Sequence, residues 1–329
     1  MLFSLKMEKK TLTDYLKSHK LIDVQDEVLE ISKPGEGNMN FVSRVTTMKT
    51  TLIIKQANGF VQKYPEIPAP KERILVEGTF YKTVENYPSI SKFLPNILLM
   101  DNDHYVLGLE DLGKNKDFTS LYRRGQALDK DNLWLLLNFL NQLHNKITIQ
   151  AIQNFPDNLK LRKLNHEHLF VYPFLKENGF SLDTVLPGLQ NVALKYKTDS
   201  TLFKKLAALG EIYLRRGNTL LHGDYYPGSW LQTDSGIKII DPEFCFIGPR
   251  EFEMGIFMAH IILSQSPHRL LEFLVSNYDS DQPMDWVLAR KFMGVEILRR
   301  IIGLAQLPLE LSLDEREDIC SEAFSYIMI

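Results

Sequence analysis

The chain has few cysteines and no strong excess of either charge. Its 329 residues include only Cys245 and Cys320, which are too few for a disulfide framework or a structural zinc site. We therefore expect both thiols to be reduced and buried, as is usual in a cytoplasmic protein. The formal net charge is −3, so the basic excess that neutralises nucleic-acid phosphates is missing. Nucleic acid is accordingly not an expected partner.

Long hydrophobic runs are missing as well. No uninterrupted apolar run reaches the roughly 18 residues that a membrane-spanning helix needs, and the apolar run near Met1 is too short for a signal peptide. We expect a cytoplasmic protein without a membrane partner. The composition that is present, 44% hydrophobic and 24% charged, allows a sizeable core. The length predicts two domains or one large bilobal domain.

The most informative stretch runs from Leu220 to Glu243 and reads LLHGDYYPGSWLQTDSGIKIIDPE. An apolar pair precedes a His-Gly-Asp turn that ends in Asp224, so a strand is expected to enter a tight turn there. Two further apolar segments flank a TDSG turn, which predicts a hairpin. The hairpin would return Asp241 and Glu243 to the edge that carries Asp224. One acid can then accept a proton from an attacking hydroxyl while the other two hold a divalent cation.

This arrangement is the template of phosphoryl transfer, in which one Asp orients the nucleophile and a later Asp holds Mg²⁺. The stretch resembles the phosphotransferases of the aminoglycoside and choline kinase superfamily, which have HGD where protein kinases have HRD. Its continuation, DPEFCFIGPREFEMG, resembles the metal-binding segment of 5-methylthioribose kinases. The resemblance implies Asp224 as the catalytic residue and Asp241 and Glu243 as Mg²⁺ ligands. It adds Ser229 to the metal site, at a position where most of the superfamily has Asn.

A glycine-bearing turn near the N-terminus predicts a phosphate-binding loop. The sequence KPGEGNMNFV lies between two expected strands, and its glycines would let backbone amides approach phosphate closely. The turn resembles the GDGNLNFV-type loop of methylthioribose kinases. That resemblance implies Gly35, Gly37, Asn38 and Asn40 as ATP-binding residues.

The next two motifs predict a lysine–glutamate pair. Lys55 ends an expected strand at 51–56, at the distance from the glycine turn that a kinase lysine needs to reach the phosphates. Glu77 lies in an expected helix after Pro70, on one face with apolar residues. A carboxylate on such a face needs a cation, and Lys55 is the obvious partner. We therefore expect Lys55 and Glu77 to hold the α- and β-phosphates of ATP.

A polar connection follows two further expected strands, at 97–100 and 105–109. It reads EDLG from Glu110, and its polar residues and glycine suit a hinge between lobes. In the related kinases the backbone of this segment binds the adenine edge. The resemblance implies Glu110 and Leu112 as further ATP contacts.

The rest of the chain is predicted to be mainly helical. Apolar stripes at helical spacing mark helices at 130–145, 202–216, 252–263 and 286–305. His144 stands at the end of the first of these helices, and we expect its role to be structural.

The last of these helices carries two adjacent arginines, Arg299 and Arg300. Neighbouring helix positions diverge by about 100°, so at most one is expected to face solvent if the flanking apolar residues are buried. Planar guanidinium forks suit sugar hydroxyls and developing phosphate charge. The sequence LRRIIGLAQ resembles the paired-arginine helix of methylthioribose kinases. The resemblance implies Arg299, Arg300 and Tyr226 as acceptor contacts, with Tyr226 where the relatives tend to have His.

The motifs together predict an α+β, bilobal protein-kinase-like fold. A small antiparallel-sheet lobe at 1–109 would bind ATP, a hinge would span 110–113, and a mainly helical lobe at 114–329 would carry the catalytic and acceptor residues. The expected reaction is Mg²⁺-dependent transfer of the γ-phosphoryl group of ATP to a hydroxyl of a small sugar. The resemblance makes 5-methylthioribose, a methionine-salvage sugar, the first candidate, and it implies a possible homodimer.

Two alternatives stay open from the sequence. The acceptor could be choline, an aminoalcohol or an aminoglycoside, with Tyr225, Tyr226, Trp230 and Trp286 forming an aromatic cage for a cation. Adjacent arginines would repel such a substrate. Alternatively, the protein could be a catalytically weak nucleotide-binding scaffold on the same fold, although neither the lysine nor an acid of the motifs is lost.

Overall fold

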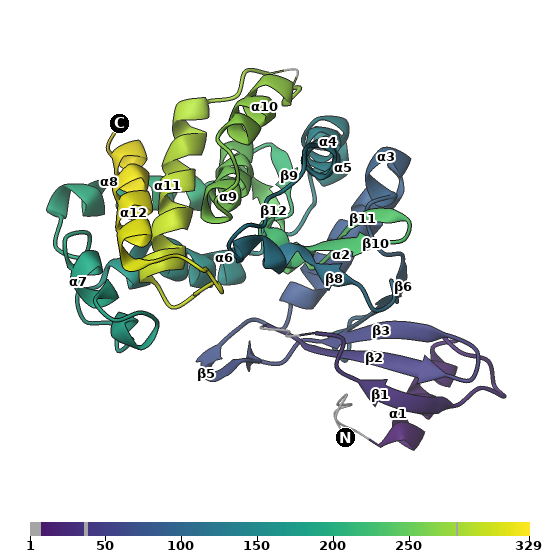
Figure 1. Ribbon diagram of the computed structural model, residues 1–329. Helices are drawn as coiled ribbons and strands as arrows, with labels where there is room; N and C mark the ends of the chain where they lie inside the picture. The colour runs from purple at the N-terminus through teal and green to yellow at the C-terminus, as the bar shows by residue number, and fades with distance from the viewer. Residues whose placement is uncertain (1–7, 36–38, 281) are drawn as a thin grey trace. The chain divides into compact units, whose positions relative to one another are not determined.

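The structure is a computed structural model that describes residues 8–35, 39–280 and 282–329. It divides into two compact units, each made of two segments, and the segments of the two units alternate along the chain. The first unit contains Met1–Lys116 and Gln232–Cys245, and the second contains Asp117–Leu231 and Phe246–Ile329 (Figure 1). The lobe boundary expected at 110–113 stays a prediction.

A five-stranded antiparallel sheet is the framework of the first unit, in the order β1-β2-β3-β7-β6. Its strands are β1 (Val28–Ser32), β2 (Phe41–Thr47), β3 (Thr51–Gln56), β6 (Ile97–Asp101) and β7 (Val106–Glu110). The central strand β3 reads TLIIKQ and is buried at Leu52 and from Ile54 to Gln56. Its β-branched residues suit a strand with neighbours on both sides. A small hairpin of β4 (Phe60–Val61) and β5 (Tyr64–Pro68) follows it.

Helix α1 (Lys9–Ser18) covers one face of this sheet (Figure 1). Its apolar residues belong to a core cluster with residues of β1, β2, β3 and β7. The members of this cluster are Leu12, Tyr15, Leu16, Ile22, Val28, Val45, Leu52, Ile54 and Val106. The Tyr15 hydroxyl donates to Asp101 at 2.6 Å, which fixes α1 to the end of β6.

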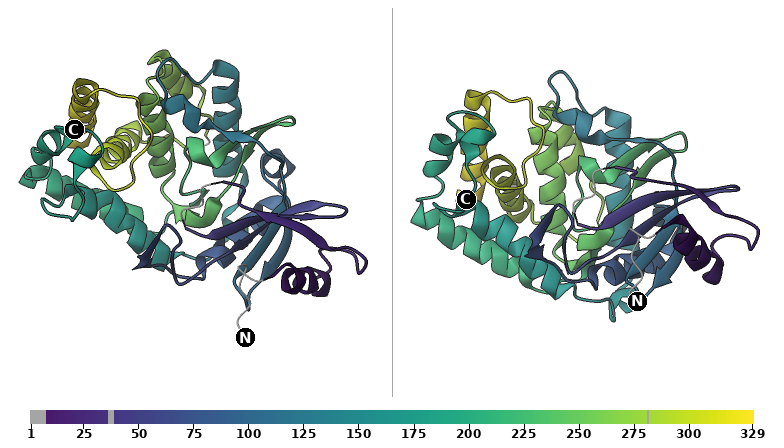
Figure 2. Two further views of the ribbon diagram at one scale, coloured as in Figure 1. Left: turned by 60° about the horizontal axis from the view of Figure 1, so that its bottom comes forward. Right: turned by 90° about the horizontal axis from the view of Figure 1, so that it is seen from below.

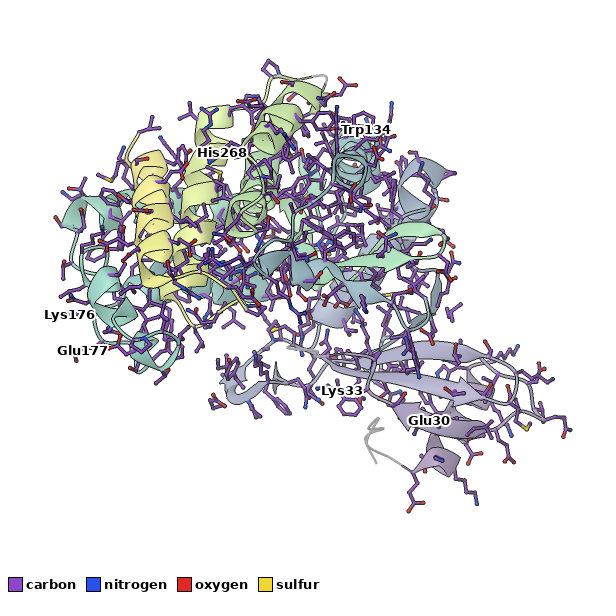
Figure 3. All side chains as sticks on the ribbon, in the orientation of Figure 1. Glu30, Lys33, Trp134, Lys176, Glu177 and His268 are labelled. Atoms are coloured by element: carbon purple, nitrogen blue, oxygen red, sulfur yellow. The ribbon has the colours of Figure 1, made fainter. Side chains whose placement is uncertain are left out.

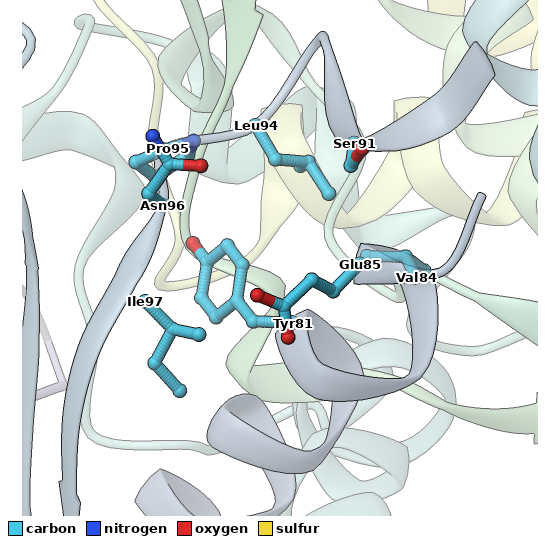
Figure 4. Close-up of a pocket in the computed structure, with 8 residues that line it drawn as sticks. All are labelled: Tyr81, Val84, Glu85, Ser91, Leu94, Pro95, Asn96 and Ile97. Carbon is cyan, nitrogen blue, oxygen red and sulfur yellow. The ribbon is translucent and has the colours of Figure 1, made fainter. Parts of the chain in front are cut away.

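Helix α2 (Arg73–Glu85) packs against β6 and β7, followed by the short helix α3 (Pro88–Ser91). A Cβ atom added at Gly78 would lie 2.8 Å from the sulfur of Met100, so the helix approaches β6 more closely than a larger residue would allow. A cavity of about 20 Å³ beside α2 is lined by Tyr81, Asn96 and their neighbours (Figure 4). This volume is enough for about one water molecule.

The predicted hairpin is present as β10 (Trp230–Thr233) and β11 (Gly236–Ile239). Gly236 has φ +104°, a conformation that glycine adopts without strain and that closes the tight turn. The boundary between the two units falls within β10. A second boundary falls in the two-residue strand β8 (Lys116–Asp117). The chain after β11 contains the short 3₁₀ helix η6 (Pro242–Phe244).

The second unit is mainly helical, with one small antiparallel pair of β9 (Thr219–Leu221) and β12 (Phe246–Gly248). Its α-helices are α4 (Lys130–Lys146), α5 (Ile149–Ile152), α6 (Leu159–His166), α7 (Leu189–Leu194), α8 (Ser200–Leu214), α9 (Arg250–Leu263), α10 (Arg269–Asn277), α11 (Trp286–Ile302) and α12 (Leu313–Met328). Shorter turns are η1 (Phe118–Tyr122), the π-helix η2 (Glu167–Val171), η3 (Tyr172–Phe174), η4 (Leu182–Thr184) and η5 (Pro227–Ser229).

Helix α11 lies between α9 and α12 and is buried along most of its length (Figures 1 and 2). Two glycines allow this close packing. A Cβ atom at Gly255 of α9 would lie 2.6 Å from the carbonyl oxygen of Ala289, and one at Gly294 of α11 would lie 2.4 Å from that of Ala323. Helix α11 therefore holds its side chains in a rigid frame.

The two units together confirm the predicted α+β class, with a small antiparallel sheet and a larger helical part. Charged side chains such as Glu30, Lys33, Lys176 and Glu177 point outward (Figure 3). Cys245 and Cys320 are not joined in a disulfide bond and are buried, as expected. Within 8–35, 39–280 and 282–329, no helix has the length and apolar character needed to cross a membrane.

Candidate active site

The first unit gathers Lys55, Glu77 and Asp241 into one group, which we call the lysine cluster. Lys55 lies on β3, paired with Val42 of β2 and Leu107 of β7. Its Nζ donates to Glu77 Oε1 at 2.6 Å and also to Asp241 Oδ1. The lysine–glutamate pair expected from the sequence is thus present, and it is buried: the exposed fractions of the two side chains are 6% and 0%.

Charge keeps this cluster ionic despite its burial. Burial disfavours the charged form of Lys55, but Asp241 and Glu77 outweigh that effect and hold the pKa of Lys55 well above its usual value. Burial raises the pKa of Glu77, which Lys55 counteracts in part. Lys55 is therefore protonated at neutral pH and able to bind phosphate oxygens.

Asp241 occupies a backbone conformation that points its carboxylate into the cluster. It has φ 63° and ψ 49°, a left-handed geometry that Asp tolerates better than most residues. The side chain is 45% exposed, whereas that of Glu243 is 13% exposed. Asp241 is accordingly the more accessible of the two proposed metal ligands.

Glu243 is held by Asn40 and Arg73. The Asn40 Nδ2 donates to Glu243 Oε2 at 2.7 Å, and the Asn40 Oδ1 accepts from Arg73 Nε at 2.9 Å. The remaining guanidinium nitrogens of Arg73 donate to the backbone carbonyls of Met39, Asn58, Phe60 and Pro70. Arg73 therefore ties the turn before β2 to the segment that carries Glu243. This role of Arg73 was not predicted from the sequence.

Of the other predicted ATP residues, Gly35 lies between β1 and β2, and Glu110 is the last residue of β7. Gly35 is exposed, with open space around its Cα, while Gly37 and Asn38 lie outside the described residues. Glu110 accepts from the backbone and side-chain nitrogens of Asn96 at 3.0 and 2.8 Å.

The segment after Glu110 is held by Arg44 of β2. The Arg44 guanidinium makes a bidentate pair with Asp111, at 2.8 and 2.9 Å, and also donates to the carbonyl of Gly113. The backbone around Leu112 is thus fixed to the sheet, which suits a segment expected to bind adenine through its main chain.

The His-Gly-Asp turn belongs to the second unit and follows β9. Gly223 has φ +84°, which only glycine adopts without strain. Its N–H donates to Glu253 Oε1 of α9 at 2.8 Å. The other oxygen of Glu253 lies 2.8 Å from His144 Nε2, and His144 Nδ1 lies 2.9 Å from the Tyr278 hydroxyl. His144 therefore has a structural role, as expected, but one directed at the residue next to Asp224.

Ser229 holds the same turn from the other side. Its hydroxyl donates to the carbonyl of Asp224 at 2.8 Å, and the residue is 1% exposed. The Ser229 hydroxyl thus stabilises the His-Gly-Asp turn. The metal contact implied by the resemblance stays a prediction.

Of the proposed acceptor residues, Arg300 lies beside the side chain of Asp224, and Tyr226 lies against Arg300. Arg300 Nη2 lies 3.9 Å from Asp224 Oδ1, and the Arg300 guanidinium lies 4.9 Å from the centroid of the Tyr226 ring. Arg299 and Arg300 are each 7% exposed, so neither faces solvent. Both bind Glu296, which lies about one turn before them on α11. We call Glu296, Arg299 and Arg300 the arginine cluster; Glu296 was not identified from the sequence.

The metal ligands predicted from the sequence include two carboxylates of the first unit, Asp241 and Glu243. In the part of the chain that the structure describes, no group of three or more His, Cys, Asp or Glu could hold a metal ion. A Mg²⁺ ion on Asp241 and Glu243 would take its remaining ligands from nucleotide phosphates and water, as is usual for this ion.

Comparison with known proteins agrees with the motifs. The chain is 25% identical to a methylthioribose kinase of Geobacillus sp. (strain WCH70), over 86% of this chain and 80% of that protein. It is 28% identical to the methylthioribose kinase of Geobacillus thermodenitrificans (strain NG80-2), over 83% and 78%. No protein-family model matches the chain.

Solved structures of two kinase groups share the fold. Choline kinase from Streptococcus pneumoniae superposes with a TM-score of 0.55 at 14% identity, covering 97% of this chain and 98% of that one. An AMP-bound spectinomycin phosphotransferase superposes with a TM-score of 0.57 at 14% identity, covering 97% and 99%. The predicted resemblance is thus confirmed: the chain is similar to methylthioribose kinases over most of its length and has the fold of choline kinases and aminoglycoside phosphotransferases.

Proposed function

We propose that this protein is an ATP-dependent small-molecule kinase that phosphorylates a hydroxyl of a small sugar, with 5-methylthioribose as the first candidate. The observation that carries the proposal is the position of Asp224 beside the buried Arg300, whose Nη2 lies 3.9 Å from the Asp224 carboxylate. The similarity to methylthioribose kinases supports this acceptor.

The lysine cluster suits the phosphates of ATP. Lys55 is a buried, protonated cation anchored by Glu77, and it would bind the α- and β-phosphate oxygens. Asp241 and Glu243 would hold Mg²⁺, which when bound neutralises charge on the phosphates. Carboxylates outnumber cations among the paired residues of this part of the first unit. Three carboxylates pair with two cations, namely Glu77, Asp241 and Glu243 with Lys55 and Arg73.

The second unit supplies the groups that act on the acceptor. Asp224 would accept a hydrogen bond and then the proton from the attacking hydroxyl. Its side chain is 29% exposed, so an acceptor can reach it. The forks of Arg299 and Arg300 would bind hydroxyl oxygens and the negative charge that develops during transfer. Tyr226, stacked under Arg300, would limit how the acceptor approaches.

The choline-type alternative is less well supported. Tyr225 and Trp230 are 0% and 1% exposed, and they pack against Phe257 in the core. Trp286 packs against Tyr278. Three of the four aromatic residues of the supposed cage are thus occupied in aromatic packing within the protein. Two arginines beside Asp224 would also repel a cationic acceptor.

A screen of acceptors tests the proposal. ATP consumption would be measured with 5-methylthioribose, ribose, choline, ethanolamine and spectinomycin, each with and without Mg²⁺. We expect the largest kcat/KM with the thioribose sugar and no turnover without the metal. A clear preference for choline or spectinomycin would reassign the acceptor, and nucleotide binding without turnover on any acceptor would favour the scaffold alternative. The cytoplasmic location and the homodimer remain predictions from the sequence and the resemblance.

A further inference from the structure

Glu296 is the central anion of the arginine cluster and is fully buried, with 0% exposure. Its Oε2 accepts from Arg299 Nε, and its Oε1 accepts from Arg299 Nη2 at 3.0 Å and from Arg300 Nε at 2.7 Å. The spacings of three and four residues explain how adjacent arginines reach one carboxylate. Two guanidinium groups are therefore held by one acid, which leaves one positive charge in excess beside Asp224.

His260 of α9 is the third residue that contacts the Glu296 carboxylate. Its Nε2 lies 3.1 Å from Glu296 Oε1, and its Nδ1 lies 2.7 Å from the Tyr122 hydroxyl. The ring is 1% exposed. Burial lowers the pKa of His260 to about 4, and the two arginines add to this effect although Glu296 opposes it. The imidazole is thus neutral near pH 7 and carries a single N–H.

The partners decide which nitrogen carries that hydrogen. An ionised carboxylate can only accept hydrogen bonds, so the contact with Glu296 requires Nε2–H. Nδ1 is then the acceptor for the Tyr122 hydroxyl, whose pKa is raised by burial so that it keeps its proton. The hydrogen bonds accordingly run in one direction, from Tyr122 to His260 and from His260 to Glu296, and both arginines also donate to Glu296.

We propose that Glu296 and His260 are positioning residues of the acceptor site: they act through Arg299 and Arg300 by fixing the two guanidinium forks beside Asp224. An arginine side chain that is free to rotate loses rotamer entropy when it is ordered. In this protein the side chains of Arg299 and Arg300 are already ordered in the folded state. Arg300 Nη1 donates to the carbonyl of Ala305 at 3.4 Å, so Arg300 Nη2, which lies 3.9 Å from Asp224, is the nitrogen of this fork that would meet the acceptor without rearrangement. This inference rests on the proposed function, because it assigns the arginines to the acceptor.

The first test changes the charge of the anchor. In Glu296→Gln the side chain keeps its size, but only one oxygen can accept and the NH₂ group faces guanidinium donors. We expect kcat/KM for the sugar to fall about tenfold to a hundredfold, while the KM for ATP stays within a few-fold. Glu322→Gln on α12 is the control, since the Glu322 side chain accepts from Tyr326 on its own helix. It should leave both KM values unchanged.

The second test separates the two nitrogens of His260. Glutamine can place an NH₂ group near Nε2 and keep the donor to Glu296, whereas asparagine places its polar group near Nδ1 and loses that donor. We expect His260→Asn to raise the sugar KM several-fold more than His260→Gln does. A general packing defect would instead reduce the activity and the melting temperature of both variants in parallel. The KM for ATP and the KM for the sugar would then change equally. Equal sugar KM values in the two variants would overturn the proposed role of His260.

The third test needs no turnover. Nitrogen-15 NMR of the wild-type protein labelled at histidine reports the tautomer of each ring, with His260→Gln to assign the signal. The inference requires His260 to carry its hydrogen on Nε2 and to stay neutral from pH 8 to about 5.5. A hydrogen on Nδ1, or a cationic ring at pH 7, would overturn it. If the wild type phosphorylates no acceptor, the proposed function fails, and this spectrum still decides the hydrogen-bond direction separately.

Discussion

The lysine cluster and the arginine cluster are opposite in charge. In the first unit one lysine stands between two carboxylates, Glu77 and Asp241. In the second unit one carboxylate, Glu296, stands between two arginines. Each cluster is thus unbalanced by about one charge. The positive excess of the arginine cluster faces the Asp224 carboxylate, 3.9 Å from Arg300, and the negative excess of the lysine cluster includes Asp241, which is 45% exposed. These signs suit the proposed ligands: a cation with its nucleotide in the first unit, and an acceptor hydroxyl beside Asp224 in the second.

The anchoring also differs between the two clusters. Lys55 lies on the central strand β3 and reaches a carboxylate on α2 and another after β11. The arginines and their anchor all lie on α11, and the histidine that completes them lies on α9. The lysine cluster therefore depends on three segments staying together, whereas the arginine cluster is built mainly on one rigid helix. Variants of the two clusters should have separable effects.

The largest effect is expected from Asp224→Asn. The amide cannot accept the proton of the attacking hydroxyl, so turnover should fall by about 10²–10⁴-fold, with ATP affinity nearly unchanged. Single-turnover kinetics and nucleotide binding by calorimetry check this. Turnover within tenfold of wild type would show that Asp224 is not the catalytic residue.

Lys55→Ala and Asp241→Asn should both weaken productive binding of ATP, by about tenfold to a hundredfold for the loss of a charged interaction. Only Asp241→Asn should change the Mg²⁺ dependence steeply, because lysine supplies charge to phosphates and Asp241 is proposed to bind the metal. A Mg²⁺ titration at fixed ATP distinguishes them. Lys55→Ala also leaves Glu77 buried without its cation, so thermal melting must accompany the kinetics. Superimposable Mg²⁺ titrations would remove Asp241 from the metal site.

Arg299→Met and Arg300→Met test the other cluster. Methionine keeps the apolar stem and removes the fork, and a lost charged hydrogen bond is worth roughly 1.5–3 kcal/mol. At least one variant should lose about tenfold to a hundredfold in kcat/KM for the sugar, with the ATP KM within a few-fold. Arg300 is the stronger candidate because it lies nearer to Asp224. Wild-type kinetics from both folded variants would place the acceptor elsewhere and favour the choline-type alternative.

Local patterns were enough to predict much of this molecule. The turn at Gly223, the hairpin before Asp241 and the pair of Lys55 with Glu77 each follow from short-range sequence rules and are present in the structure. The α+β class followed from the same motifs. Such features depend on residues within one or two elements, where periodicity and turn chemistry act directly.

The partners of those residues could not be predicted in the same way. Glu296, His260 and Arg73 are ordinary charged or polar residues in helical sequence, and their roles depend on packing between distant segments. His260 and Glu296 meet because α9 and α11 approach closely at Gly255. Helical spacing did place Glu296 three and four residues before the arginines, which was the one available signal. That signal does not show that the site is buried, so an exposed salt bridge was equally compatible with it.

The smallest predicted effect concerns pH, and its sign differs between the two clusters. His260 has its pKa lowered to about 4 in the folded protein, against about 6.5 in an unfolded chain. As the pH falls below 6.5, the unfolded chain binds a proton that the folded ring refuses, so His260 lowers the free energy of unfolding. In the lysine cluster, burial raises the pKa of Glu77 and of Glu243. The folded state then binds protons more readily there, and stability from these groups rises as the pH falls.

The contribution of His260 can be isolated by comparing the wild type with His260→Gln. The groups that face the ring are Tyr122 of η1, Tyr226, and Glu296, Arg299 and Arg300 of α11. The pKa of Glu296 is held well below its usual value, and neither tyrosine nor arginine titrates near neutral pH. Between pH 7 and 5.5 the wild type should therefore lose about 1 kcal/mol of unfolding free energy more than the variant. Urea titrations at the two pH values measure this difference. Equal losses of unfolding free energy in the wild type and the variant would mean that the pKa of His260 is not lowered. The inference that a neutral His260 ring donates to Glu296 would then be wrong.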